Sequence, residues 1–367
     1  MLKARNAVFK VKEYHPPLGG RQGLRLDFNE NTAGCSPRVL AKLGTLGLEA
    51  LAKYPERESV ERAVAAFLLL APEQVLLTNG VDEAIHLLCQ TYIEPGDELL
   101  IPVPTYSMYE IYAAAAGGEI VSVPADDNFR FPAETLLRRI TPRTRLIAIA
   151  TPNNPTGAVA DEAVLLRLAE AAPDAALLVD EAYFEFHQKT LMSRIGSVPN
   201  LFVARTFSKA FGLAGLRAGV LAGCAEQMHL IRRVGSPYSV NSAALACVQE
   251  AMADTAFIND YVAQVRRGRE RVQSTLRELE VKFWPSEANF VLFFIGEQRL
   301  AFVEAMRQRG ILVRDRHNDP GCAGCVRITI GTDAQTEVAI KALREVMNEI
   351  GWSPKAARVA PASGRLS

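Results

Sequence analysis

Residues 206–219 read Thr-Phe-Ser-Lys-Ala-Phe-Gly-Leu-Ala-Gly-Leu-Arg-Ala-Gly and form the most informative stretch of the chain. One lysine, Lys209, lies beside the hydroxyls of Thr206 and Ser208, and Arg217 follows in the same run. Hydroxyls, backbone N–H groups and a guanidinium suit a phosphate, and the amine suits a Schiff base with an aldehyde cofactor. Most lysines are solvated surface charges. Residues elsewhere in the chain must therefore decide whether Lys209 is such a surface lysine or a cofactor-binding one.

The composition is typical of a globular protein with a substantial core, since 49% of the 367 residues are hydrophobic and 22% are charged. This length predicts two domains, or one large domain and a smaller one. The 41 basic and 41 acidic residues cancel, so we expect a small-molecule partner and neither nucleic acid nor a membrane. Residues 1–12 lack an apolar signal segment, and we expect a cytoplasmic protein.

The six cysteines are scattered along the chain, which is typical of reduced thiols in a cytoplasmic protein. Cys322-Ala-Gly-Cys325 is a CxxC motif, but no second ligand pair with metal-site spacing accompanies it. We therefore expect no metal and interpret the motif as a tight turn before a strand.

Apolar strands alternate with helices between residues 74 and 222. The predicted strands cover residues 74–78, 98–102, 119–123, 145–150, 176–180, 200–205 and 216–222. This alternation predicts an α/β fold whose large domain has a seven-stranded, mostly parallel sheet covered by helices on both faces. In such a sheet the binding site lies at the carboxyl ends of the strands.

The pattern changes after residue 222 to helices over 225–234, 242–253 and 257–280, followed by short strands and two more helices. This change predicts a smaller α+β domain. We place an N-terminal arm with part of the small domain in residues 1–44 and the large domain in 45–255. The small domain then covers 256–351, and a flexible tail covers 352–367.

Polar residues follow the predicted strands in a set that matches a phosphorylated pyridine aldehyde. Lys209 would hold the aldehyde, Asp180 would keep the ring nitrogen protonated, and Tyr106 would cover the ring. Donors for the ring hydroxyl are available from Asn154 and Tyr183. For the phosphate the chain offers the helix start at Val81 and Asp82, the hydroxyls of Thr206 and Ser208, and Arg217.

The chain resembles the class I/II aminotransferases, which are pyridoxal-phosphate enzymes of the aspartate-aminotransferase fold (fold type I). Within that group it is most similar to histidinol-phosphate aminotransferases. The resemblance extends from about residue 14 to about residue 348 and implies transamination between an amino donor and a keto acid. The runs that carry it are Tyr54-Pro-Glu, Asn79-Gly-Val-Asp-Glu83, Pro104-Thr-Tyr106, Pro152-Asn-Asn-Pro-Thr-Gly157, Asp180-Glu-Ala-Tyr183, Arg205-Thr-Phe-Ser-Lys-Ala-Phe211, Ala214-Gly-Leu-Arg-Ala-Gly219 and Val326-Arg-Ile-Thr-Ile-Gly331.

The resemblance also implies roles for individual residues. Lys209 is similar to the Schiff-base lysine that moves the substrate proton, and Tyr54 to a tyrosine that reaches the cofactor phosphate of a second subunit in a homodimer. Arg327 resembles the arginine that binds the α-carboxylate of glutamate, whereas Arg314 and Tyr14 resemble contacts to a substrate phosphate. The remaining implied positions are Asp180 at the ring nitrogen, Asn154 and Tyr183 at the ring hydroxyl, Tyr106 on the ring, Val81, Asp82, Ser208 and Arg217 at the phosphate, and Asn31 in the arm over the substrate.

One departure bears on the substrate, because residues 29–35 read Asn-Glu-Asn-Thr-Ala-Gly-Cys where the family carries Asn-Glu-Asn-Pro and a Gly-Pro turn. An aromatic or broad-specificity aminotransferase and a threonine-phosphate decarboxylase therefore stay open as alternatives. A ligand-binding module of a transcription regulator would need a DNA-binding domain, which the short arm does not provide. A nicotinamide reductase would need GxGxxG after the first strand, where Asn79-Gly-Val-Asp-Glu83 stands instead.

Overall fold

The computed structural model describes residues 2–11 and 13–353, and the structural statements below concern those residues. Most of the predicted tail, residues 354–367, lies outside them. Trp352 is the first residue of the predicted tail (352–367), and two hydrogen bonds hold it. Its indole N–H donates to the Leu279 carbonyl at 3.0 Å, and its backbone N–H donates to the Met347 carbonyl at 2.9 Å.

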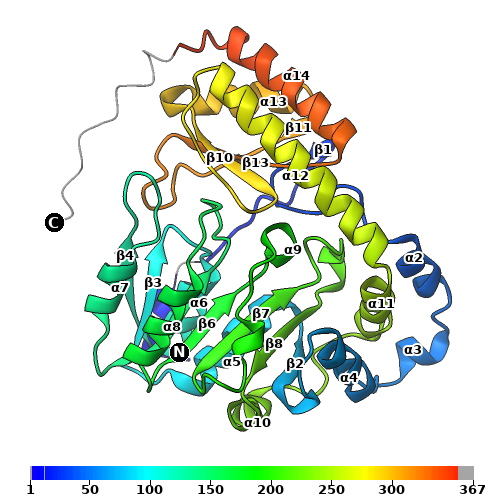
Figure 1. Cartoon of the computed structure of the whole chain (residues 1–367), viewed down its shortest axis with the longest axis vertical. Helices are drawn as coiled ribbons and strands as arrows, with labels where there is room; N and C mark the ends of the chain where they lie inside the picture. Colours follow the sequence, from blue (N-terminus) through cyan, green and yellow to red (C-terminus); the bar gives the residue numbers. More distant parts are fainter. Residues whose placement is uncertain (1, 12, 354–367) are drawn as a thin grey trace.

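The larger part of the molecule is built on a seven-stranded sheet in the order β2-β8-β7-β6-β5-β3-β4 (Figure 1). Strand β8 runs antiparallel to both of its neighbours, and the other pairs are parallel. The predicted mostly parallel, seven-stranded sheet is thus confirmed. Its strands are β2 (Val75–Thr78), β3 (Glu98–Val103), β4 (Glu119–Pro124), β5 (Thr144–Ala150), β6 (Ala176–Asp180), β7 (Leu201–Thr206) and β8 (Gly219–Gly223).

Helices cover both faces of this sheet because alternate residues of each strand point to opposite sides. In β5, Leu146 and Ala148 belong to a core shared with helices α5, α6 and α10, whereas Ile147 and Ile149 belong to a core shared with α7 and α8. The strands are therefore apolar on both sides, as the sequence predicted. The helices named here are α5 (Gly80–Tyr92), α6 (Met108–Ala116), α7 (Ala133–Arg139), α8 (Glu162–Ala171) and α10 (Ala225–Val234).

A third core extends from the large sheet to a second, antiparallel sheet in the order β12-β13-β10-β9. Long helix α12 (Thr255–Glu278) begins beside α11 (Ser242–Ala253) and runs up to this sheet, where α13 and α14 lie (Figure 1). The remaining elements of this region are β9 (Phe283–Trp284), β10 (Phe290–Phe294), α13 (Arg299–Gln308), β11 (Ile311–Leu312), β12 (Arg314–Asp315), β13 (Cys325–Thr329) and α14 (Asp333–Glu349).

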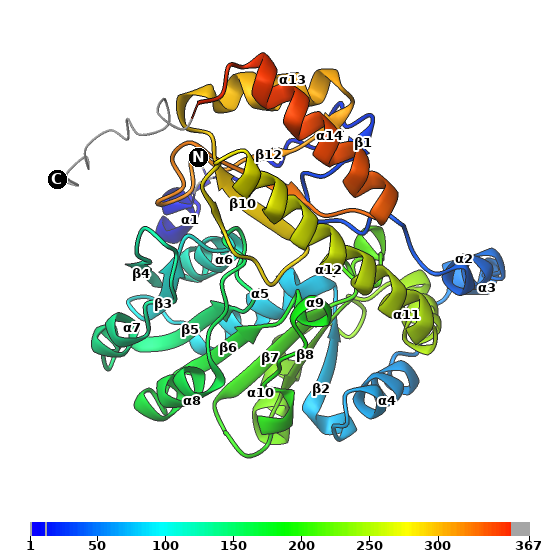
Figure 2. The ribbon, with the colours of Figure 1, turned by 45° about the horizontal axis from the view of Figure 1, so that its top comes forward.

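The N-terminal segment connects both parts of the molecule. Its first helix, α1 (Asn6–Lys10), lies beside α6 (Figure 2), and β1 (Leu24–Arg25) pairs in parallel with β11. The chain then continues through α2 (Pro37–Gly44), which Ser36 caps as predicted, α3 (Leu48–Ala52) and α4 (Glu58–Phe67). The pair β1–β11 forms a separate two-stranded sheet, through which the arm contacts the segment between α13 and β12.

Two sequence expectations need correction. The strand predicted from residue 216 begins at Gly219, because residues 214–216 form a 3₁₀ turn and Arg217 has a φ of 55°. A positive φ interrupts extended pairing. Helix α1 was not predicted, and it has no buried residue of its own that a periodic pattern would reveal. No helix in the described part of the chain is both long and apolar enough to span a membrane.

Candidate active site

The carboxyl ends of three neighbouring strands bring the predicted residues together. Asp180 ends β6 and lies opposite Ala150 of β5 and Ala204 of β7 in the sheet register. Asn154 follows β5, and Lys209 follows β7. Because these strands are parallel and adjacent, the segments that follow them leave the sheet at the same edge.

The amine of Lys209 is held at this edge by the chain itself. Its Nζ donates to the carbonyl of Phe28 at 3.2 Å and lies 5.9 Å from the centre of the Tyr183 ring. Burial, and secondarily the guanidinium of Arg327, lower the pKa of Lys209 to about 8. The amine is thus far closer to neutral at physiological pH than an ordinary lysine and can act as a nucleophile or base.

Asp180 is buried and accepts two hydrogen bonds. The hydroxyl of Tyr109 donates to Oδ2 at 2.5 Å, and the backbone N–H of Ala182 donates to Oδ1 at 3.0 Å. Burial nevertheless raises the pKa of Asp180 to about 6, although both hydrogen bonds oppose that shift. A cation beside this carboxylate would favour its ionised form, and a protonated pyridine nitrogen is such a cation.

A narrow contact between β8 and the start of α5 creates a cradle for a small anion. A Cβ on Gly219 would lie 2.7 Å from the Gly80 carbonyl carbon and 2.9 Å from the Val81 nitrogen, so only glycine permits this approach. Arg217 reaches Asp82 of the first turn of α5 at 2.9 Å. The hydroxyl of Tyr106 donates to the other oxygen of Asp82 at 2.7 Å. Thr206 and Ser208 are buried beside this region, and the N–H of Ser208 donates to the Thr206 hydroxyl at 3.1 Å.

Tyr183 is linked to the N-terminal segment. Its hydroxyl accepts a hydrogen bond from the side-chain amide of Asn29 at 2.9 Å, and Asn29 also bonds Thr329 of β13. The φ of Asn29 is 57°, which asparagine adopts more readily than most residues. Asn29 therefore joins the arm, the second sheet and the large sheet at one point.

Arg327 is buried on β13, and Arg314 is its direct partner in the antiparallel pair β12–β13. One Nη of Arg327 donates to the side-chain oxygen of Asn154, and the other donates to the carbonyl of Asp27 at 2.6 Å. Its Nε is buried and finds no hydrogen-bond partner among the described residues. Burial lowers the pKa of Arg327 to about 9, so a bound carboxylate would stabilise the guanidinium.

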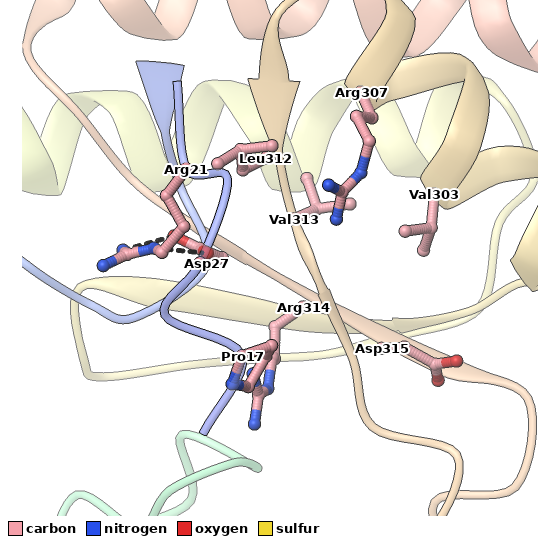
Figure 3. Close-up of a pocket in the computed structure, with 10 residues that line it drawn as sticks. Pro17, Arg21, Asp27, Val303, Arg307, Leu312, Val313, Arg314 and Asp315 are labelled. Atoms are coloured by element: carbon pink, nitrogen blue, oxygen red, sulfur yellow. Dashed lines mark hydrogen bonds and ion pairs between the residues drawn. The ribbon is translucent and has the colours of Figure 1, made fainter. Parts of the chain in front are cut away.

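Next to Arg314 a cavity of about 230 Å³ opens between the arm, α13 and β11–β12 (Figure 3). Arg21, Arg307 and Arg314 contribute guanidiniums to its lining, and Arg21 is neutralised by Asp27 at 2.8 Å. Tyr14 lies at the same edge, where its hydroxyl is 3.5 Å from a guanidinium nitrogen of Arg314. The two residues expected at a substrate phosphate are thus neighbours in space, although 300 positions separate them.

Two other predicted site residues, Asn31 and Tyr54, make other contacts within this chain. Asn31 donates to the Ala210 carbonyl at 2.8 Å and accepts from the Ala33 N–H at 2.9 Å, so its side chain holds the loop next to Lys209. The side chain of Tyr54 is 80% exposed and packs on the Tyr238 ring with 4.5 Å between centroids. In the part of the chain that the structure describes, no hydrogen bond or ring contact joins Tyr54 to the residues around Lys209.

Sequence reasoning did not select Tyr109, Asn29 or the carbonyl of Phe28. For Tyr109 a signal existed, because it follows the predicted ring-stacking residue Tyr106 by three positions, a spacing that places two side chains on one side of a helical turn. For Asn29 and Phe28 no local signal existed, since their partners are 154 and 181 positions away. The expected tight turn at the CxxC motif is present, with both thiols buried. No group of three His, Cys, Asp or Glu suited to a metal occurs in the described part of the chain.

The donor set fits pyridoxal 5′-phosphate. A lysine amine whose pKa is lowered to about 8 suits its aldehyde, and a buried carboxylate without an ion-pair partner among the described residues suits its ring nitrogen. The glycine-lined start of α5, with Ser208 and Arg217, suits its phosphate.

Comparisons with known proteins agree with this geometry. The family described as aminotransferase class I and II matches residues 21–343. The chain is 33% identical to a histidinol-phosphate aminotransferase of Moorella thermoacetica, over 94% of this chain and 93% of the relative. It is also 33% identical to one of Methanosarcina mazei, over 94% of this chain and 96% of the relative.

Solved structures share the fold. The histidinol-phosphate aminotransferase of Sinorhizobium meliloti in complex with pyridoxal-5′-phosphate has a TM-score of 0.85 and 24% identity, covering 95% of this chain and 99% of that one. The aspartate aminotransferase of Thermus thermophilus with maleate has a TM-score of 0.78 and 24% identity, covering 94% and 100%. At 24% identity these two structures show a shared fold. The family match and the relatives at 33% identity show the family. The chain belongs to the class I and II aminotransferases, whose cofactor is pyridoxal 5′-phosphate.

Proposed function

We propose that this enzyme transfers the amino group of L-histidinol phosphate to 2-oxoglutarate and forms imidazole acetol phosphate and L-glutamate. The observation that carries the proposal is the pair Arg314 and Arg327, which stand opposite each other in the sheet register, with Arg327 near enough to the Lys209 amine to lower its pKa. Two guanidiniums at one edge suit substrates that carry a carboxylate in one half-reaction and a phosphate in the other. The relatives named histidinol-phosphate aminotransferase support the same substrate.

The protein's own residues divide the work. When bound, pyridoxal phosphate supplies an aldehyde that captures the substrate amine and a ring that accepts the electron pair of the broken Cα–H bond. Lys209 Nζ takes the proton from the substrate Cα, because burial lowers the pKa of the amine to about 8 and so raises its uncharged fraction. Asp180 holds the ring nitrogen protonated. Asn154 and Tyr183 bind the ring hydroxyl, and Tyr106 stacks on the ring.

The anionic ends are bound separately. Val81, Asp82, Thr206, Ser208 and Arg217 bind the cofactor phosphate through the start of α5, two hydroxyls and a guanidinium. Arg327 binds the α-carboxylate of glutamate. Arg314 and Tyr14 bind the substrate phosphate at the edge of the cavity next to β12, and Asn31 holds the arm over the substrate.

The assembly is part of the proposal. We infer a cytoplasmic homodimer in which Tyr54 of each subunit reaches the cofactor phosphate of the other. The exposed tyrosine supports this role, because its side chain is 80% exposed within one chain although it is large and apolar. Residues 45–255 form the large domain, 256–351 the small one, and residues 1–44 connect them.

Substrate turnover tests the function. Purified protein incubated with pyridoxal phosphate should gain visible absorbance that glutamate removes, and Lys209→Ala should not gain it. The loaded wild type should then convert histidinol phosphate faster than phenylalanine and release no carbon dioxide from threonine phosphate. Faster turnover of phenylalanine would instead identify an aromatic aminotransferase. Carbon dioxide release would identify a decarboxylase, and a colourless wild type would contradict the cofactor.

A further inference from the structure

One buried hydrogen bond beside the reacting groups has no part in the roles given above. Tyr109 is fully buried, and its hydroxyl donates to Oδ2 of Asp180 at 2.5 Å. A buried tyrosine hydroxyl normally finds a partner, so the existence of a hydrogen bond is expected. What distinguishes this hydrogen bond is its acceptor, Asp180, which is the carboxylate assigned to the ring nitrogen of the cofactor.

The hydrogen bonds of Asp180 restrict how its carboxylate can turn. Ala182 occupies Oδ1 through its backbone N–H at 3.0 Å, and Tyr109 occupies Oδ2. A carboxylate offers about four acceptor positions, so both oxygens keep capacity for a further donor. With one donor on each oxygen, the plane of the carboxylate is fixed and its remaining lone pairs have a defined direction.

Helix α6 gives Tyr109 a firm position. It begins after the loop that carries Tyr106, and the two rings pack edge to face with 5.8 Å between centroids. Tyr106 in turn donates to Asp82, which pairs with Arg217. The Asp180 carboxylate and the phosphate cradle are therefore linked through two packed aromatic rings, Tyr109 on α6 and Tyr106 in the loop before it.

We propose that Tyr109 is a positioning residue that holds Asp180 ionised and oriented toward the ring nitrogen of the cofactor. The proposal rests on the proposed function only in that pyridoxal phosphate binds at Asp180. The physical reason is that burial favours the neutral carboxyl group, whereas a hydrogen bond donated by the tyrosine hydroxyl favours the carboxylate. Without that donor the carboxyl group would be protonated more readily and would turn more freely.

Other groups also face Asp180 and act on its charge. Asp82 of α5 and the adjacent Glu181 repel the carboxylate, and the hydroxyls of Tyr106 and Tyr183 lie near enough to interact with it. None of these four groups donates a hydrogen bond to Asp180 within the described residues. Among the described side chains named here, Tyr109 is thus the one that donates a hydrogen bond to Asp180.

A double-mutant cycle on cofactor affinity separates this role from packing. The probe is pyridoxamine 5′-phosphate, which cannot react with Lys209, and binding is followed by fluorescence titration of the apo-proteins. We expect Tyr109→Phe to weaken binding about tenfold, in line with the loss of a hydrogen bond to a charged group. In the Asp180→Asn background the same change should alter affinity by less than about twofold, because the charged acceptor is already gone. An equal loss in both backgrounds would mean a packing role and would overturn the proposal.

The pH dependence of the same titration gives a second readout. Wild-type affinity should fall as pH drops through about 6, where Asp180 takes up a proton. In Tyr109→Phe this acidic limb should move up by about one pH unit, because the lost donor had lowered the pKa. An unmoved limb would contradict the proposal.

Control variants keep the outcome interpretable. Tyr92→Phe, at the end of α5, also removes a hydroxyl that donates a hydrogen bond, here to Gln227 of α10, and should change neither readout. If Tyr109→Phe does not fold, Tyr109→Met removes the hydroxyl with a more adaptable side chain. Binding by the wild type without any effect of Tyr109 defeats this inference alone, whereas no binding by the wild type defeats the proposed function.

Discussion

The amine of Lys209 lies against the carbonyl of Phe28 and near the guanidinium of Arg327, and burial makes its charged form costly. The same burial makes the charge of Asp180 costly. Desolvation acts in opposite directions on an acid and a base, so it brings the pKa of the lysine down and that of the aspartate up. Both groups then titrate within reach of physiological pH, which acid–base chemistry requires.

The rate at which the apo-enzyme captures pyridoxal phosphate should follow the neutral fraction of Lys209. Since burial lowers the pKa to about 8, the rate should rise with pH up to about 8 and then level off. A lysine with an ordinary pKa near 10.4 would give a rate that rises about tenfold per unit through pH 9. Stopped-flow absorbance between pH 6 and 10 measures the profile. A rate that keeps rising steeply above pH 9 would contradict the lowered pKa.

Replacing Arg327 by lysine should weaken glutamate binding. The guanidinium is planar and can bind a carboxylate with two parallel hydrogen bonds, whereas an ammonium cannot. We expect KM for glutamate to rise about 10- to 100-fold, as for loss of a charged hydrogen bond. Arg309→Lys serves as the matched control, because Arg309 forms ion pairs with Glu345 and Glu349 on the surface. A KM for glutamate that is the same in Arg327→Lys and in the control would rule out the carboxylate role.

At the scale of elements, the cradle depends on how closely β8 approaches the first turn of α5. Glycines at residues 80 and 219 let the backbones meet, and the positive φ of Arg217 ends the turn before β8. The N-terminus of a helix attracts anions because its first N–H groups are unpaired. The distance between two elements thus decides whether a phosphate fits.

Gly219→Ala should impair this cradle. The added Cβ would lie 2.7 Å from the Gly80 carbonyl carbon, so β8 and α5 must separate. Overpacking of this kind costs about 1–3 kcal/mol of the free energy of unfolding, which urea titration of the apo-protein measures. The affinity for pyridoxamine 5′-phosphate should fall with it.

Gly215→Ala is the control, because a Cβ there would meet nothing within 4 Å. It lies in the 3₁₀ turn that precedes β8 and should leave both the unfolding free energy and the affinity near wild type. Wild-type affinity in Gly219→Ala would show that the close approach does not matter for the phosphate.

At the scale of the whole molecule, the site needs segments that are distant in the sequence. The arm supplies the Phe28 carbonyl to Lys209, and the second sheet supplies Arg327 to Asn154. The arm is bound to that second sheet by the Thr329 N–H of β13, which donates to the Leu26 carbonyl at 2.9 Å, and it also pairs with β11 through β1. The reacting edge of the large sheet is thus closed by two segments that are fixed to each other.

Mixing two inactive variants tests the proposed exchange of Tyr54 between subunits. In a hybrid dimer of Lys209→Ala and Tyr54→Ala, one site carries both changes and the other carries neither. If subunits reassort at random, the mixture should recover about a quarter of wild-type activity. Subunits are mixed under mild denaturant, and turnover is measured after dilution. If Tyr54 served its own subunit, the mixture would show no recovery.

Local sequence determined much of this protein. The alternation of apolar strands with helices predicted the seven-stranded sheet, because burial on both faces leaves a pattern within each segment. The runs around Lys209, Asp180 and Asn154 predicted the cofactor, because each strand carries its functional residue at its own end.

The tertiary structure decided the rest. Register alone places Arg314 opposite Arg327, and only the folded chain brings Asn29 to Tyr183 and Tyr109 to Asp180. The start of β8 was mispredicted because a positive φ at Arg217 leaves no apolar pattern. Periodicity reports what a segment buries, but not which distant segment covers it. Hydrogen bonds across 71 to 181 positions depend on that packing, and so do the shifted pKa values of Lys209 and Asp180.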